Sequence, residues 1–279
     1  MEHCLNETQQ YILQVLRDVV RILDELEIPY YMQGGTMLGA VRHKGIIPWD
    51  DDVDLGIPRA DYQRLLEQVA DKLPENLELR TYDDETDHHY YFARIVDKRY
   101  QIRRMGSLEE RLENVWVDLF PLDGMPVGLL ARQWHKLRLL TVRLKYHLSC
   151  FERVNIKRPG RPLVERIIIK IATWTRVGSW FNTRKQLDKM DRLLKKYSPE
   201  ATGYFVNFMG QTSYKFNEMF KKSVYGKGKR YPFEDLELVG PEDYDGYLSS
   251  LYGDYMTPPK VEDRNAHASE LVPTDEGRD

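Results

Sequence analysis

Apolar residues recur along the first half of the chain with spacings that alternate between helical and strand-like. Residues 7–27 carry apolar side chains at helical spacing before Pro29, and residues 59–73 repeat the pattern before Pro74. Strand-like runs occupy 30–33, 52–55, 77–82, 90–96, 100–103 and 115–120. The pattern therefore predicts helices packed on short strands.

The spacing of apolar residues becomes helical throughout from about residue 127 to 198, where three apolar stripes recur. They consist of Leu129, Leu130, Trp134, Leu137, Leu140 and Leu144, then Leu163, Ile167, Ile168, Ile171 and Trp174, and then Leu187, Met190, Leu193 and Leu194. Stripes this wide predict a helical core, although a basic amphipathic helix can also lie on an anionic membrane. Residues 201–279 are rich in Tyr, Gly and Pro, with a short helix expected over 243–252 and a loose tail after Arg264.

Charge is distributed unevenly along the 279 residues. Residues 131–200 carry 18 Lys/Arg against 5 Asp/Glu, whereas residues 1–130 carry 14 against 25 and residues 201–279 carry 9 against 14. A basic middle segment favours an anionic partner such as a nucleic acid, a membrane surface or a polyphosphate polymer, but a solvated helical face explains it equally well. The sequence shows neither a signal-peptide pattern nor 18 successive uncharged apolar residues, and its two cysteines are too few for a disulfide framework, so we expect a cytoplasmic protein.

A glycine pair and a basic loop follow the first strand-like run. Gly34 and Gly35 are expected to form a turn, and Thr36 to be the N-cap of a short helix. A strand, a glycine turn and a helix start present backbone N–H groups that can hold phosphate. Arg42 and Lys44 add positive charge after this helix. Many Gly-Gly pairs are simple turns, so the signal depends on what surrounds it.

The densest charge cluster comes directly after this loop. Asp50, Asp51, Asp52 and Asp54 fall within five positions. Because residues two apart in a strand point to the same face, Asp52 and Asp54 are expected to project together. Carboxylates this close repel one another unless a cation lies among them, and an oxygen-only ligand set favours Mg²⁺ or Mn²⁺. An EF-hand calcium loop is disfavoured, because a leucine stands where that motif requires glycine.

A further carboxylate is embedded in the apolar run Val-Trp-Val-Asp-Leu-Phe at 115–120. A buried carboxylate is costly unless it is paired or bound to a metal. We therefore expect Asp118 to join Asp52 and Asp54 as the third acid of one site. This requires the two strands to be neighbours in the sheet, which the sequence alone does not show.

Together these motifs resemble the signature of the LicD family, phosphocholine transferases of bacterial surface glycans. The resembling segments are 34–45, 48–54, 116–124, 230–234 and 252–259. The resemblance implies an α+β fold with a nucleotidyltransferase-like mixed sheet flanked by helices. It also implies three parts: a catalytic core over 1–126, a basic helical segment over 127–200 and a Tyr/Pro/Gly-rich C-terminal region over 201–279 that completes the catalytic domain.

The family resemblance implies Mg²⁺-dependent transfer of phosphocholine from CDP-choline to a sugar hydroxyl of a teichoic acid, lipopolysaccharide or capsule precursor, with release of CMP. The implied roles are metal binding and catalysis by Asp52, Asp54 and Asp118, phosphate binding by Gly34, Gly35 and Thr36, and neutralisation of CMP by Arg42 or Lys44. Asp118 could also accept the proton of the acceptor hydroxyl, although the sequence does not identify the general base. Choline is a quaternary ammonium that aromatic faces attract, and the candidate faces are Trp49, Trp116, Tyr90, Tyr91, Tyr225 and Tyr231.

Several alternatives stay open. The family is related to fukutin-type transferases that move ribitol phosphate, so a CDP-ribitol or CDP-glycerol donor is possible, as is an NTP-dependent nucleotidyltransferase. A non-catalytic anion- or membrane-binding protein is disfavoured by the intact acidic triad. The expected partners are a CDP-alcohol donor and a lipid-linked glycan acceptor, without nucleic acid. Peripheral contact with an anionic membrane would place the protein at the inner face of the membrane.

Overall fold

The computed structural model describes residues 5–83, 90–104, 111–150, 180–210, 216–260, 264, 269–274 and 277. The second apolar stripe predicted from the sequence, at 163–174, lies outside these residues. Within them, no helix is both long enough and apolar enough to cross a bilayer.

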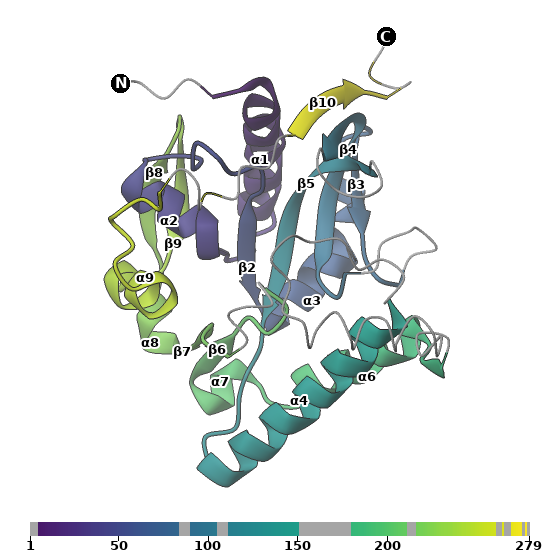
Figure 1. Ribbon diagram of the computed structural model, residues 1–279, viewed down its shortest axis with the longest axis vertical. Helices are drawn as coiled ribbons and strands as arrows, with labels where there is room; N and C mark the ends of the chain where they lie inside the picture. Colours follow the sequence, from purple (N-terminus) through teal and green to yellow (C-terminus); the bar gives the residue numbers. More distant parts are fainter. Residues whose placement is uncertain are drawn as a thin grey trace.

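A six-stranded mixed sheet forms the centre of the molecule (Figure 1). Its strands are β1 (Tyr31–Met32), β2 (Asp54–Pro58), β3 (Leu77–Arg80), β4 (Ala93–Arg104), β5 (Arg111–Leu122) and β10 (Ser269–Pro273). The order is β1-β2-β5-β4-β10, with β3 also paired to β4. Only the β2–β5 pair is parallel among these strands. The predicted α+β class with a mixed sheet is therefore confirmed.

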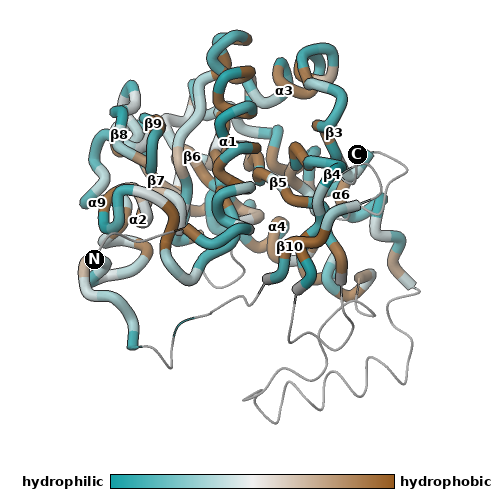
Figure 2. The backbone as a smooth tube through the Cα atoms, turned by 90° about the horizontal axis from the view of Figure 1, so that it is seen from above, coloured by the Kyte–Doolittle hydropathy of each residue, from teal (hydrophilic) through white to brown (hydrophobic). Residues whose placement is uncertain are grey.

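Helices from the first half of the chain cover this sheet. They are α1 (Glu7–Glu25), α2 (Gly34–Arg42), α3 (Arg59–Gln68) and a 3₁₀ turn, η1 (Ala70–Lys72). The helix α1 packs on β5, β4 and β10 through a mainly apolar face that includes Leu16 and Leu23. Figure 2 shows apolar residues, in brown, in the middle of the molecule around β5, where residues 115–122 are all buried. The helical periods at 7–27 and 59–73 thus correspond to real helices that bury their apolar faces.

Two predictions about strands were wrong in detail. The runs at 90–96 and 100–103 belong to one long strand, β4, whose pairing with β5 is interrupted by an irregularity between Asp97 and Gln101. The tail after Arg264 is not wholly loose, because β10 pairs antiparallel with β4. An edge strand offers unpaired backbone N–H and C=O groups, and a distant segment can satisfy them without a strong local signal.

The second half of the chain adds a helical pair and several short elements. They are α4 (Leu129–Ser149), α6 (Thr183–Leu194), α7 (Pro199–Thr202), β6 (Tyr204–Val206), β7 (Met219–Lys221), α8 (Lys222–Tyr225), β8 (Lys229–Phe233), β9 (Leu236–Gly240) and α9 (Tyr244–Tyr252). The pair α4 and α6 lies below the sheet in Figure 1, whereas α9 and β8 pack on α2. The predicted short helix over 243–252 is confirmed by α9.

An ion pair buried in the interior joins the sheet to the helical pair. Arg59, the first residue of α3, donates through Nε and Nη2 to the two carboxylate oxygens of Asp123 at 2.6 and 2.7 Å. The Tyr91 hydroxyl accepts from Arg59 and donates to Asp191 of α6. Removing one partner of such a buried pair leaves an uncompensated charge, so this contact fixes how the helical pair sits on the sheet.

The two apolar stripes that the structure describes in the helical segment differ in burial. Leu187, Met190, Leu193 and Leu194 on α6 are buried, as predicted. The stripe on α4 was predicted to build a core, and that prediction was wrong: its residues are exposed, and α4 instead buries His135, Leu139, Arg143 and Tyr146. The apolar period of a helix shows that a face exists, but the neighbours of the helix decide which face is covered.

Candidate active site

Asp54 and Asp118 lie side by side on the two parallel strands. Asp54, the first residue of β2, is the register partner of Asp118 on β5, and the backbone N–H of Asp118 donates to the carbonyl oxygen of Val53 at 3.0 Å. The adjacency that the sequence left open is therefore confirmed. Asp118 is 5% exposed, as expected for an acid inside an apolar strand.

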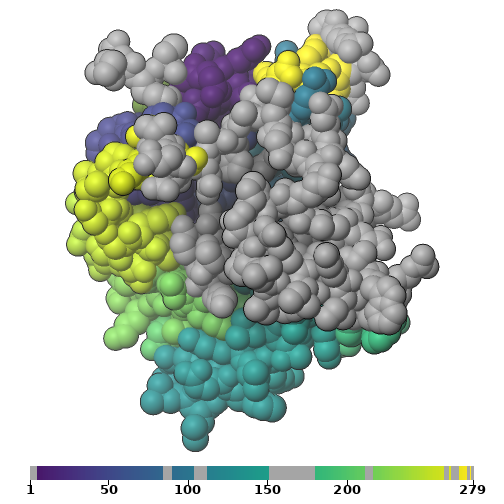
Figure 3. Space-filling view, in the orientation of Figure 1, coloured from purple at the N-terminus to yellow at the C-terminus, as the bar shows by residue number. Residues whose placement is uncertain are grey.

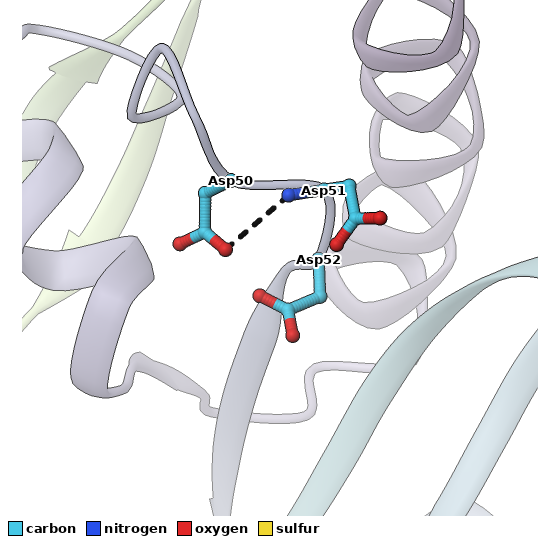
Figure 4. Close-up of side chains that lie close together, drawn as sticks. All are labelled: Asp50, Asp51 and Asp52. Atoms are coloured by element: carbon cyan, nitrogen blue, oxygen red, sulfur yellow. Dashed lines mark hydrogen bonds between the residues drawn. The ribbon is translucent and has the colours of Figure 1, made fainter. Parts of the chain in front are cut away.

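The remaining aspartates occupy the loop that leads into β2 (Figure 4). One carboxylate oxygen from each of Asp50, Asp51 and Asp52 lies within 4.8 Å of the others. The Asp50 carboxylate accepts a hydrogen bond from the backbone N–H of Asp51 at 3.2 Å. Asp52 precedes β2, so its expected place within the strand was wrong. The negative charges of the loop nevertheless act on Asp54 and raise the pKa of its carboxyl.

Neighbouring carboxylates raise the pKa values of Asp54 and Asp50. Desolvation raises the pKa of the Asp54 carboxyl well above its usual range, and the neighbouring aspartates, Asp52 first, raise it further. Burial and the charge of Asp52 act in the same way on the pKa of Asp50. A divalent cation relieves this kind of repulsion, and an all-oxygen donor set suits Mg²⁺ or Mn²⁺. The residues present therefore fit the predicted metal site.

Asp118 is held by two donors. Its Oδ1 accepts from Arg94 Nε at 2.6 Å and its Oδ2 from Trp116 Nε1 at 3.1 Å. The Arg94 guanidinium is stacked between Tyr90 and Trp116, at 4.0 and 4.4 Å from the ring centroids. Burial raises the pKa of Asp118, while Arg94 acts in the opposite direction. Each oxygen keeps a second lone pair, so Asp118 is oriented but still able to bind a cation.

The glycine turn becomes the first turn of α2. The helix begins at Gly34, which has a φ of +46°, and Gln33 is its N-cap. The predicted capping role of Thr36 was wrong, because its hydroxyl accepts from the backbone N–H of Asp54 at 2.9 Å. A Cβ on Gly35 would lie 3.0 Å from a carboxylate oxygen of Asp50. The two glycines thus let the start of the helix approach the acid cluster. The first N–H groups of a helix have no intrahelical acceptor.

The C-terminal region contributes residues that the sequence motifs did not reveal. A narrow polar cleft is lined by Gln33, Gly34, Gly35, Asp54, Asn207, Gly210, Glu218 and Tyr252. The backbone N–H of Gly34 donates to the Tyr247 hydroxyl at 2.9 Å, which ties α9 to the glycine turn. Glu218 is 4% exposed, and burial raises its pKa to about 8. Its one sequence signal is an acid in the segment Phe-Asn-Glu-Met-Phe, a weaker signal than the acid in the fully apolar surroundings of Asp118.

One family match contains the aspartates of the loop and of both strands. Residues 27–134 match the model of the LicD/FKTN/FKRP nucleotidyltransferase domain. This segment belongs to the LicD family. Asp54, Asp118 and the glycine turn all lie inside the LicD domain, whereas Glu218 lies beyond it.

Individual relatives extend the LicD similarity. The lipopolysaccharide cholinephosphotransferase LicD of Haemophilus influenzae is 27% identical over 269 residues, which cover 94% of this chain and 95% of the relative. An uncharacterised protein of Rickettsia typhi is 45% identical over 168 residues, 52% of this chain and 53% of the relative. Human ribitol 5-phosphate transferase FKRP is 49% identical over 53 residues, 19% of this chain and 9% of the relative. The prediction of a LicD-type transferase is confirmed by these similarities.

The basic residues after α2 make contacts away from the acids of the LicD domain. Arg42 Nη1 donates to the carbonyl oxygen of Tyr255 at 2.9 Å, and Lys44 is exposed, with its Nζ donating to the carbonyl oxygen of Val41. Arg42 therefore anchors the C-terminal region in this structure. A role for either residue in neutralising a nucleotide stays a prediction.

The aromatic faces proposed for choline are largely occupied. Tyr90 and Trp116 stack on Arg94, and the Trp49 ring lies 4.1 Å from the Arg264 guanidinium. The other three candidates, Tyr91, Tyr225 and Tyr231, are buried. None of the six presents an open aromatic face beside the acids in this structure.

Proposed function

We propose that this chain transfers phosphocholine from CDP-choline to a sugar hydroxyl of a bacterial cell-surface glycan and releases CMP. The near full-length similarity to a lipopolysaccharide cholinephosphotransferase supports this donor, and lipopolysaccharide, teichoic acid and capsule precursors are the acceptor classes. The high identity to ribitol 5-phosphate transferase over 53 residues supports ribitol or glycerol phosphate as the alternative group.

The observation that carries the proposal is the register of β2 and β5. It puts the carboxylates of Asp54 and Asp118 next to each other at the start of α2, beside the loop that bears Asp52. Transfer of a phosphoryl group depends on positioning and on neutralising negative charge. Backbone N–H donors could contact the phosphate, and the paired carboxylates could hold a divalent cation that would supply the positive charge. A surface loop of acids would not require one acid to be buried and another half-buried on neighbouring strands.

Each residue of the site has a proposed role. Asp52, Asp54 and Asp118 hold Mg²⁺ or Mn²⁺, and a divalent ion bound there supplies positive charge to the diphosphate of the donor. The first turn of α2, from Gly34 to Thr36, contacts a phosphate through its backbone N–H groups. Arg94 keeps the Asp118 carboxylate in a fixed orientation.

Two carboxylates are candidates for the general base. Asp118, chosen from the sequence, is held by Arg94 and Trp116. Glu218 lines the same cleft as Asp54 and makes no ion pair within the described residues. A base with a pKa near the working pH transfers protons well, and the raised pKa of Glu218 agrees with such a role.

The decisive experiment compares donors side by side. Purified protein with Mg²⁺ is incubated with CDP-choline, CDP-ribitol, CDP-glycerol or a nucleoside triphosphate in the presence of a glycan acceptor. We expect CMP and a phosphocholine-modified acceptor from CDP-choline alone. Transfer from CDP-ribitol or CDP-glycerol instead would reassign the group, and release of pyrophosphate from a triphosphate would show a nucleotidyltransferase.

The acceptor is proposed to be lipid-linked, and the protein to work in the cytoplasm or at the inner face of the membrane. Nucleic acid is not an expected partner. These assignments rest on the LicD similarity and on the basic helical segment, and the donor experiment is independent of them.

A further inference from the structure

The helix α4 has a buried face and an exposed face. One packs into the protein and includes Leu139 and Tyr146, which are 0% and 7% exposed. The other consists of Leu129, Leu130, Trp134, Leu137, Leu140 and Leu144, which are between 38% and 89% exposed. At 3.6 residues per turn these six positions fall within a sector of about 140°, opposite the buried face. The exposed face therefore forms one continuous apolar stripe along the helix.

The stripe continues into a groove between α4 and α6. The groove has a volume of about 570 Å³ and its apolar lining includes Trp134, Leu137, Val142 and Leu193. Figure 3 shows α4, in teal, as a projecting part of the molecular surface at the bottom of the view. Contiguous apolar surface of this kind is uncommon on soluble proteins unless it binds something.

Positive charge borders the groove. Arg138, Lys189, Arg192 and Lys196 line it, and no ion pair formed within the described residues involves any of the four. They belong to the basic segment in which Lys/Arg outnumber Asp/Glu by 18 to 5. A purely apolar protein partner would leave these cations desolvated and unpaired, whereas a surface that is anionic outside and apolar inside satisfies both features.

We infer that the face formed by the exposed stripe of α4 and the basic rim of the α4–α6 groove docks on an anionic lipid bilayer. The helix would lie in the plane of the interface, with the stripe among the acyl chains and Arg138, Lys189 and Lys196 at the headgroups. The biological purpose rests on the proposed function, because a lipid-linked acceptor is presented at such a surface. The binding itself is measurable whether or not that function is correct.

The test is co-sedimentation of the full-length protein with vesicles of phosphatidylcholine, with and without phosphatidylglycerol. We expect binding to the anionic vesicles, weakened at high salt because the charge contribution is screened. The triple variant Leu130→Ser/Leu137→Ser/Leu144→Ser and the double variant Arg138→Glu/Lys189→Glu should each lower the partition coefficient about 10-fold or more. Met256→Ser, at an apolar residue that is 54% exposed elsewhere, and Lys227→Glu are the matched controls and should bind as wild type.

The outcomes separate this inference from its competitors. Failure of the wild type to bind anionic vesicles, or undiminished binding by both multiple variants, overturns it. A wild-type dimer that the triple variant converts to monomer, without vesicle binding, shows a protein interface instead. Thermal melting equal to wild type excludes misfolding of the variants. Vesicle binding without transfer from any CDP donor would overturn the proposed function and leave the docking surface in place.

Discussion

The acids on β2 and β5 and the exposed face of α4 depart from ordinary burial in opposite directions. On these two strands Asp118 is 5% exposed and Asp54 lies against a loop of three further aspartates. On α4 six large apolar side chains face outward. Buried like charges and exposed apolar stripes both raise the free energy of the isolated protein. Each agrees with the partner proposed for it, a divalent cation and a phosphate at the acids and a lipid bilayer at α4.

The two regions also differ in how tightly their geometry is set. Hydrogen bonds between β2 and β5 and from Asp54 to Thr36 hold the acids to a defined register. The stripe on α4 depends only on the helical period and on which face the neighbours leave uncovered. Substitutions should therefore affect chemistry sharply at the first region and stability hardly at all on the exposed face of the second.

The largest effect is expected at the acids. Asp54→Ala or Asp52→Ala should lower transfer about 10³-fold, because metal binding by such carboxylates contributes several kcal/mol to the transition state. Circular dichroism should show an intact fold. If both variants keep more than about a tenth of the wild-type turnover, the metal role of these residues is wrong. Asp118→Asn should also be inactive, and an active variant removes that residue from the mechanism.

A pair of substitutions on α4 separates its two faces. Leu139→Ala, at a residue that is 0% exposed, should lower the free energy of unfolding by about 3 kcal/mol, because it leaves a cavity. Leu130→Ala, at a residue that is 89% exposed, should change it by less than about 0.5 kcal/mol. Urea denaturation measures both. Equal losses for the two variants would show that the exposed stripe is covered in solution.

Glu218 lies in the same cleft as Asp54 and is a second candidate for the general base. If this carboxylate accepts the proton of the acceptor, Glu218→Gln should lower kcat about 10²-fold and abolish the rise of kcat/KM with pH that its ionisation produces. Glu237→Gln, at an exposed glutamate, is the control. An unchanged pH profile together with a raised KM would assign Glu218 to binding, and Asp118 would remain the base.

The smallest effect concerns stability and pH. The folded-state pKa of Asp54 is raised above its unfolded value of about 4, so the folded protein holds this proton more tightly. Stability is consequently lost as pH rises from about 4 through the folded pKa. In chelator, Asp54→Asn should be more stable than wild type by about 1 kcal/mol at pH 8, and the difference should shrink toward pH 4. Added Mg²⁺ should stabilise only the wild type, as thermal melting at several pH values can show.

Local patterns in the sequence were enough to predict most elements and the chemistry of the acids. The periods at 7–27 and 59–73 predicted α1 and α3, and an acid inside the run at 115–120 predicted a buried Asp118. These predictions hold because helix and strand periodicity, and the cost of burying a carboxylate, depend on neighbours within a few positions.

Only the tertiary structure decided what depends on distant contacts. It paired Asp54 with Asp118, gave Asp118 its partner Arg94, brought Glu218 to the cleft and added β10 to the edge of β4. It also chose which face of α4 is buried. The sequence of a helix or strand specifies the width and chemistry of each face, but strand register and the choice of covered face come from packing against segments far away in the chain.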